Sequence, residues 1–254
     1  MTMPFHNLLT IRGLTKSFTL HAVDGRVVRG LCGVDLDILE GEHVALAGRS
    51  GAGKSSLLKC VHRTYVADDG VVVYRRANGD AVDLLSMSDS DVADLRSQEI
   101  GYVSQFLRAE PRRGVLDVVA GAARRMGVDE GEARDRAADV LRRVNIDESL
   151  WSTYPTLLSG GEKQRVNLAA GIVEAPRLLL LDEPVSALDP ANRVAVLDIL
   201  SDLTSRGATV LSVFHDIDAM RVLADRVVVM EDGVVVDHGE ANQVLDRNLE
   251  RELV

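Results

Sequence analysis

Residues 48–55 read Gly48-Arg-Ser-Gly-Ala-Gly53-Lys54-Ser55, and this stretch decides the fold. A glycine, four residues, a second glycine, then Lys and Ser form the pattern of a phosphate-binding P-loop. The glycines let the backbone turn its N–H groups inward around an anion, and a following helix adds positive partial charge at its N-terminus. A strand predicted to end at Ala47 and a helix predicted to start near Gly53 provide the required context. Given the average frequency of glycine, roughly one chain in a hundred is expected to match the P-loop pattern by chance.

A second stretch, Leu178-Leu-Leu-Leu-Asp182-Glu183-Pro184, places two acids at the end of an apolar run. Buried carboxylates are costly unless they are paired or bind a metal ion. We expect Asp182 to hold the hydration shell of Mg²⁺ and Glu183 to act as general base toward an attacking water. The apolar run alone fits a buried helix equally well, but Pro176 before it and Pro184 after it favour a strand.

Short apolar segments alternate with amphipathic ones along the chain, which is typical of α/β proteins. Residues from about 106 to 165 are rich in Ala and Arg and predict a helical lobe inserted into the α/β core. Helices are predicted to begin at Gly53, Ser88, Asp129, Gly160, Pro190 and Asp216. Strands are predicted at Val34–Ile38, His43–Ala47, Val71–Arg75, Ile100–Val103, Leu178–Leu181, Thr209–Val213, Val227–Met230 and Val234–Asp237.

Two details of the predicted helices bear on packing and binding. Helical spacing places four apolar side chains of the helix after Pro190 on one face, namely Val194, Leu197, Leu200 and Leu203. The arginine pairs of the lobe fit either a docking surface or a solvated helix face; they are Arg112-Arg113, Arg124-Arg125 and Arg142-Arg143.

Composition narrows the class of protein. The 254-residue chain is 46% hydrophobic and 27% charged, with a formal net charge of −10. This balance excludes wholesale disorder and argues against direct nucleic-acid binding. Only Cys32 and Cys60 are present, so we expect no disulfide framework and a cytoplasmic location. No stretch approaches eighteen consecutive apolar residues, so membrane contact is expected only through a partner.

The stretch Leu158-Ser-Gly-Gly-Glu-Lys-Gln-Arg165 resembles the signature motif of the ABC ATPases. Read locally, it predicts a helix N-terminus with Ser159 as the cap and Glu162 in the first turn. In ABC ATPases the signature grips a γ-phosphate held by the P-loop of the opposite subunit. The resemblance therefore implies two nucleotides sandwiched in a dimer, formed with a second copy or with a related ABC subunit. Four residues are expected to act across this interface: Ser159, Gly160, Gly161 and Glu162. Glu162 stands where the commonest signature has Gln, and Glu is a frequent alternative.

Four further positions match the superfamily pattern. Gln105 resembles the Q-loop glutamine that touches Mg²⁺ and senses the partner, and Ser186-Ala-Leu-Asp189 resembles the D-loop that crosses the dimer interface. His215 resembles the switch histidine at the γ-phosphate. Phe18 lies where the family places an aromatic ring under adenine. A single histidine is more often structural, and a single phenylalanine is more often part of the core. These predictions therefore depend on the order and spacing of the motifs along the chain.

The resemblance covers about residues 9–239 and implies an α/β P-loop NTPase fold with a single ABC-type ATP-binding domain over residues 1–254. It implies a RecA-like core (about 1–105 and 166–254), an N-terminal antiparallel β-subdomain and the helical subdomain (about 106–165). It also implies an ATP hydrolase with ATP and Mg²⁺ as cofactors, and Glu183, His215 and Lys54 as catalytic residues. The expected Mg²⁺ ligands are Ser55, Gln105 and Asp182. The expected ATP contacts are Phe18, Gly48, Arg49, Ser50, Gly51, Ala52, Gly53, Lys54, Ser55 and Ser56.

The connecting segments, among them Tyr102-Val-Ser-Gln-Phe-Leu-Arg108 and Val213-Phe-His-Asp216, are similar to the PhnL family. PhnL is an ATP-binding subunit of the phosphonate carbon–phosphorus lyase system, which is associated with making ribose 1-methylphosphonate 5-triphosphate. This resemblance implies soluble phosphonate-system subunits as partners. The alternative is the nucleotide-binding subunit of an ABC membrane transporter, of importer or lipoprotein-release type, whose Q-loop and helical lobe receive a helix of a membrane subunit. A soluble ABC ATPase of DNA repair or translation, and an ATP-binding scaffold without turnover, are weaker alternatives.

Overall fold

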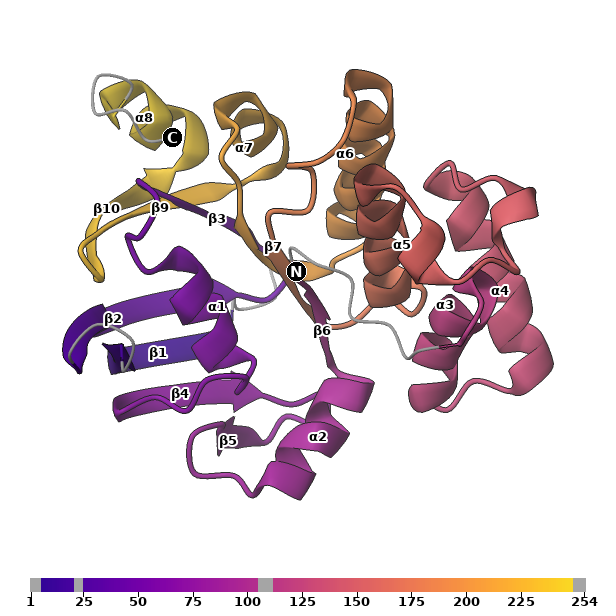
Figure 1. The fold of residues 1–254 in the computed structure, drawn as a ribbon. Coiled ribbons are helices and arrows are strands. Elements are labelled where there is room, and N and C mark those ends of the chain that lie inside the picture. Colours follow the sequence, from indigo (N-terminus) through magenta and orange to yellow (C-terminus); the bar gives the residue numbers. More distant parts are fainter. Residues whose placement is uncertain (1–5, 21–24, 105–111, 249–254) are drawn as a thin grey trace, which may run out of the picture.

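The computed structural model describes residues 6–20, 25–104 and 112–248, which form two sheets and their covering helices (Figure 1). The first sheet is antiparallel, with the strand order β2-β1-β4-β5. Its strands are β1 (Asn7–Leu20), β2 (Arg26–Leu39), β4 (Asp69–Arg75) and β5 (Ala81–Asp83). The register between β1 and β2 shifts at several positions, and Gly13 takes φ +56° at one of them.

The second sheet has six strands in the order β10-β9-β3-β8-β7-β6. All neighbouring pairs are parallel except β10 against β9. The strands are β3 (His43–Ala47), β6 (Ile100–Val103), β7 (Leu178–Asp182), β8 (Thr209–Val213), β9 (Arg226–Glu231) and β10 (Val234–Glu240). The carboxyl ends of β3 and β7 therefore meet at one edge of the sheet, where α/β proteins bind ligands.

Both faces of the parallel strands are buried, which explains their continuous apolar sequences. In β7, Leu179 and Leu181 pack into one hydrophobic core, while Leu178 and Leu180 pack into the other. The first core joins the sheet to the helices of the lobe and to α6 (Pro190–Ser205), α7 (Ile217–Leu223) and α8 (Ala241–Asn248). The second core joins the sheet to α1 (Lys54–Val61) and the antiparallel sheet. Helix α1 lies between the two sheets (Figure 1).

The helices of the lobe pack against one another at one side of the molecule (Figure 1). They are α3 (Val115–Arg125), α4 (Glu130–Arg143) and α5 (Gly160–Ile172), with short 3₁₀ turns at Glu148–Leu150 and Pro155–Leu157. The other helices are α1 (Lys54–Val61), α2 (Asp89–Gln98), α6 (Pro190–Ser205), α7 (Ile217–Leu223) and α8 (Ala241–Asn248). None of the described helices is both long and apolar enough to cross a bilayer.

The structure confirms the predicted fold class, the eight predicted strands and, within one residue, the six predicted helix starts. Strands β1 and β5, the first part of β2 and helix α8 were not predicted. Of the four apolar side chains predicted to share one face of α6, Leu200 and Leu203 are buried and Val194 is 57% exposed, while the core also receives Val196 and Ile199.

Candidate functional site

The P-loop connects β3 to α1, as its sequence predicts, and is wedged between two neighbouring strands. Gly48 has φ +132°, and an added Cβ atom would lie 2.2 Å from the carbonyl oxygen of Met230 in β9. Gly53 has φ +102°, and its added Cβ would lie 2.3 Å from the carbonyl oxygen of Gly30 in β2. No side chain fits at either position. The two motif glycines therefore allow the loop to fold this closely against the sheets.

Lys54, the first residue of α1, is only 5% exposed. Its Nζ donates to the backbone oxygens of Gly48 at 2.5 Å and Arg49 at 2.9 Å, so the ammonium lies inside the loop. Burial lowers the pKa of Lys54, while the nearby carboxylates of Glu183 and Asp182 act in the opposite direction. The cation is thus held at the centre of a loop of backbone dipoles, beside two acids.

Ser55 and Asp182 meet as the sequence predicts, although they are far apart along the chain. The Ser55 hydroxyl donates to Asp182 Oδ1 at 2.7 Å, and the Tyr102 hydroxyl donates to Asp182 Oδ2 at 3.1 Å. The Asp182 side chain lies at the end of β7 and is almost fully buried, with Lys59 Nζ 4.0 Å from Oδ2. Tyr102 was not predicted from sequence.

These oxygens suit a magnesium ion that is bound together with a nucleotide. Mg²⁺ prefers oxygen ligands and in nucleotide sites takes only one or two from the protein, with water and phosphate oxygens completing the shell. The Ser55 hydroxyl and the Asp182 carboxylate offer such a pair. In the part of the chain that the structure describes, no cluster of three or more His, Cys, Asp or Glu side chains could hold a metal ion by itself.

Glu183 and His215 also come together. His215 Nε2 lies 2.7 Å from Glu183 Oε1, although the two residues come from the ends of different strands, β7 and β8. Glu183 has φ +57°, an uncommon conformation for a residue with a side chain. Such strain persists only where the surroundings hold the backbone in place. The Glu183 N–H donates to the carbonyl oxygen of Val213 at 3.1 Å, which is one such restraint.

A second restraint on the Glu183 backbone comes from Gln164 of helix α5. This role of Gln164 was not predicted from the sequence. Its buried amide donates to the Glu183 carbonyl oxygen at 2.5 Å and accepts from the N–H of Ala187 at 3.0 Å. The loop that follows β7 is therefore fastened to the helix that begins at Ser159. Gln164 lies six residues after Leu158, within the signature stretch, and this position is the signal in the sequence that could have identified it.

The signature stretch forms the start of α5, and the local prediction is confirmed. Ser159 Oγ accepts from the N–H of Glu162 at 3.3 Å, and the Glu162 carboxylate accepts from the N–H of Ser159 at 2.7 Å. Hydrogen bonds from the Ser159 side chain and backbone lower the pKa of Glu162. Ser159 and Gly160 are exposed, and Gly161 lies close to the D-loop, since an added Cβ would be 3.2 Å from the Ala187 oxygen.

The remaining predicted positions are distributed as follows. Phe18 lies in β1 with its ring centroid 5.2 Å from that of Tyr65. A Cβ atom added to Gly30 would lie 2.7 Å from Phe18 Cε2 and 3.4 Å from Ser56 Oγ, so Phe18 approaches the first turn of α1.

Asp189 caps α6 by accepting from the N–H of Asn192 at 3.0 Å. Gln105 lies outside the described residues. The other predicted P-loop contacts, Arg49, Ser50, Gly51 and Ala52, lie in the loop itself.

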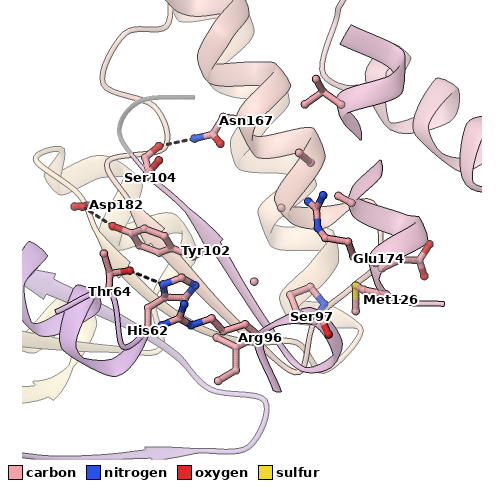
Figure 2. A pocket seen from close by; sticks show the side chains of 18 of the residues that line it. His62, Thr64, Arg96, Ser97, Tyr102, Ser104, Met126, Asn167, Glu174 and Asp182 are labelled. Atoms are coloured by element: carbon pink, nitrogen blue, oxygen red, sulfur yellow. Dashed lines mark hydrogen bonds between the residues drawn. The ribbon is translucent and has the colours of Figure 1, made fainter. Parts of the chain in front are cut away.

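A cavity of about 470 Å³ extends from Ser55 and Asp182 toward the lobe (Figure 2). Side chains from α1, α2, β6, α3 and α5 line it. Its lining includes Arg96, Arg113 and Arg125, and, apart from Asp182, the acid Glu174, which follows α5. Positive charge therefore predominates on the walls that lie away from Asp182.

Comparison with known proteins identifies the family. Residues 31–186 match the family described as ABC transporter. The chain belongs to the ABC transporter ATPase family. The arginine transport ATP-binding protein ArgV of Corynebacterium glutamicum is 38% identical over 230 residues, which are 87% of this chain and 88% of ArgV. The methionine import ATP-binding protein MetN of Streptomyces avermitilis is 35% identical over 241 residues, which are 94% of this chain and 68% of MetN.

A solved structure supports the same assignment. The ATP-binding cassette MJ0796, described as a dimer in a post-hydrolysis state bound to ADP and Pi, has a TM-score of 0.83 and 27% identity. The match covers 92% of this chain and 98% of that one. This ABC ATPase is thus an ATP-binding, ATP-hydrolysing cassette.

The predicted superfamily is confirmed, whereas the narrower resemblance to the phosphonate carbon–phosphorus lyase subunit is not supported. The relatives named above are transport ATPases. The prediction of soluble phosphonate-system partners rested on that resemblance and is not supported either. The connecting segments that suggested this system include Gln105 and His215, positions that match the ABC superfamily as a whole, so they do not separate one ABC system from another.

Proposed function

We propose that this ABC ATPase is the nucleotide-binding subunit of an ABC importer. The observation that carries the proposal is the 38% identity to an arginine transport ATPase over nearly the full length of both chains. The glycine betaine/proline betaine transport ATPase ProV of Escherichia coli is also similar, at 34% identity, and the chain spans 53% of its length. Arginine, methionine and betaines are small solutes with an amino-acid-like charge pattern, so we propose a transported solute of this class.

In the proposed mechanism, the P-loop amides and Lys54 bind the phosphates of ATP, and Phe18 stacks under adenine. Ser55 and Asp182 would hold Mg²⁺, which would neutralise charge on the phosphates. Glu183 orients the attacking water and accepts its proton, and His215, 2.7 Å from that carboxylate, stabilises the transferring phosphoryl group. Each contact is an electrostatic positioning effect of the kind that phosphoryl transfer requires.

The exposed N-terminus of α5 is proposed to complete the site of a second subunit. Ser159 and Gly160 are exposed, and the helix start presents N–H groups with positive partial charge. Gln164 ties this helix to the carbonyl of Glu183, so the signature and the general base belong to one rigid unit. Closure of two subunits around ATP would place the signature of each subunit at the γ-phosphate bound by the other, and each signature would move together with the Glu183 of its own chain. Hydrolysis would then release the bridge between the subunits.

The cavity between core and lobe is proposed as the docking site for a helix of the membrane subunit. It joins the lobe helices α3 and α5 to the walls of the nucleotide site at Ser55 and Asp182. A helix seated there would contact both parts of the ATPase. Opening and closing of the dimer would in this way move the membrane subunit.

An uptake assay tests the proposed function. Cells carrying the intact gene should accumulate one labelled solute among arginine, methionine and glycine betaine, and cells lacking the gene should not. Expression of the Glu183→Gln variant should fail to restore uptake, because a transporter without hydrolysis cannot cycle. Normal uptake of all three solutes in the deletion strain, together with lost growth on methylphosphonate, would favour the phosphonate system instead.

A further inference from the structure

Tyr102 lines the cavity and hydrogen-bonds the carboxylate of Asp182. It lies in β6, where it pairs in register with Leu180 of β7. Asp182 follows Leu180 by two residues, so both side chains project to the same face of the sheet. The Tyr102 hydroxyl donates to Asp182 Oδ2 at 3.1 Å, while Ser55 donates to Oδ1 at 2.7 Å. Hydrogen bonds to both oxygens fix the orientation of this carboxylate.

The Tyr102 ring packs against His62, the residue after helix α1. The two rings are stacked, with centroids 4.7 Å apart and an angle of 27° between their planes. His62 is itself held by Thr64, whose Oγ1 lies 2.7 Å from His62 Nδ1. Figure 2 shows Arg96 beside His62, and all four side chains line the cavity.

We propose that Tyr102 is a positioning residue for the metal-binding carboxylate, and that its stack on His62 links Asp182 to the wall of the docking cavity. A ligand carboxylate that is held by an outer hydrogen bond binds its metal more tightly, and loss of such a partner typically weakens affinity about 10–100-fold. The proposal rests on the proposed ATP·Mg²⁺ function of the site and adds two residues to it. A group that docks against His62 would act on the Tyr102 ring and through it on Asp182.

Tyr102→Phe removes the hydroxyl and keeps the ring, so it tests the hydrogen bond. Mn²⁺ binding to the full chain with saturating ADP can be measured by electron paramagnetic resonance. We expect affinity for Mn²⁺ to fall about tenfold, since the carboxylate loses one restraint. Affinity for ADP measured in EDTA should not change, whereas a general loss of structure would lower both.

Tyr74→Phe is the matched control, because the buried Tyr74 hydroxyl donates to Glu99 at 3.0 Å, outside the site. It should leave Mn²⁺ affinity unchanged. His62→Ala removes the stacking face and should weaken Mn²⁺ in the direction of Tyr102→Phe, and His62→Phe, which keeps an aromatic face, should restore it.

The outcomes separate the two levels of the proposal. Wild-type affinity for Mn²⁺ in Tyr102→Phe would overturn the role of Tyr102, and a wild-type value in His62→Ala would overturn the link to the cavity. No Mn²⁺ binding by the wild-type chain with ADP would overturn the ATP·Mg²⁺ site itself.

Discussion

Replacement of Glu183 by glutamine is expected to slow ATP hydrolysis by roughly 10²–10⁴-fold, because the amide cannot take a proton from water. The site geometry should survive, since Gln keeps the size of Glu and the backbone at φ +57° is held by Gln164 and Val213. ATP should therefore still bind. Steady-state phosphate release and the affinity for labelled ATP, measured on the same preparation, check both parts.

Glu132→Gln provides the control for this variant. Glu132 is an exposed residue of α4 that pairs with Arg136, so its loss should leave turnover unchanged. Hydrolysis by Glu183→Gln at close to the wild-type rate would contradict the assignment of the general base. Because the variant keeps ATP bound, it should also sediment as a dimer in ATP and as a monomer without it.

Replacement of Lys54 by alanine is expected to weaken ATP binding by roughly 2–5 kcal/mol, about 30-fold to several thousand-fold. The ammonium is buried in the loop at 2.5 Å from the Gly48 oxygen, so its removal leaves no other lysine at this point of the loop. Titration of a fluorescent ATP analogue measures the loss.

Thermal unfolding of Lys54→Ala shows whether the loop remains folded without the two hydrogen bonds of Nζ. Arg136→Ala removes a cation from the distant helix α4 and should bind ATP as the wild type does. An unchanged ATP affinity in a folded Lys54→Ala protein would disprove the role of the P-loop lysine.

The predictions that succeeded depend on local pattern. Three predicted features each occupy only a few consecutive residues: the P-loop, the acids at the end of β7 and the cap at Ser159. The conformation of each follows from its own sequence, from the glycines of the P-loop, the apolar run of β7 and the capping side chain of Ser159. Strand β1 was not predicted because its sequence lacks a regular alternation of polar and apolar residues. Gly13 interrupts the alternation, and the pairing of β1 with β2 shifts register at several positions.

Other features depend on contacts between distant parts of the chain. Tyr102 reaches Asp182 across two strands, 80 residues apart in sequence, and only the register of β6 against β7 brings them together. Gln164 likewise meets Glu183 only in the folded chain. The biological system was least predictable, because the motifs that hydrolyse ATP are the same whichever partner the lobe contacts.

Affinity purification of the native chain from a detergent extract, with identification of the proteins that come with it, tests the importer function most directly. An importer subunit should be recovered with an integral membrane protein, and charge reversal of the cavity residue Arg125 should reduce this recovery. Recovery with soluble phosphonate-system subunits and without any membrane protein would contradict the proposed function.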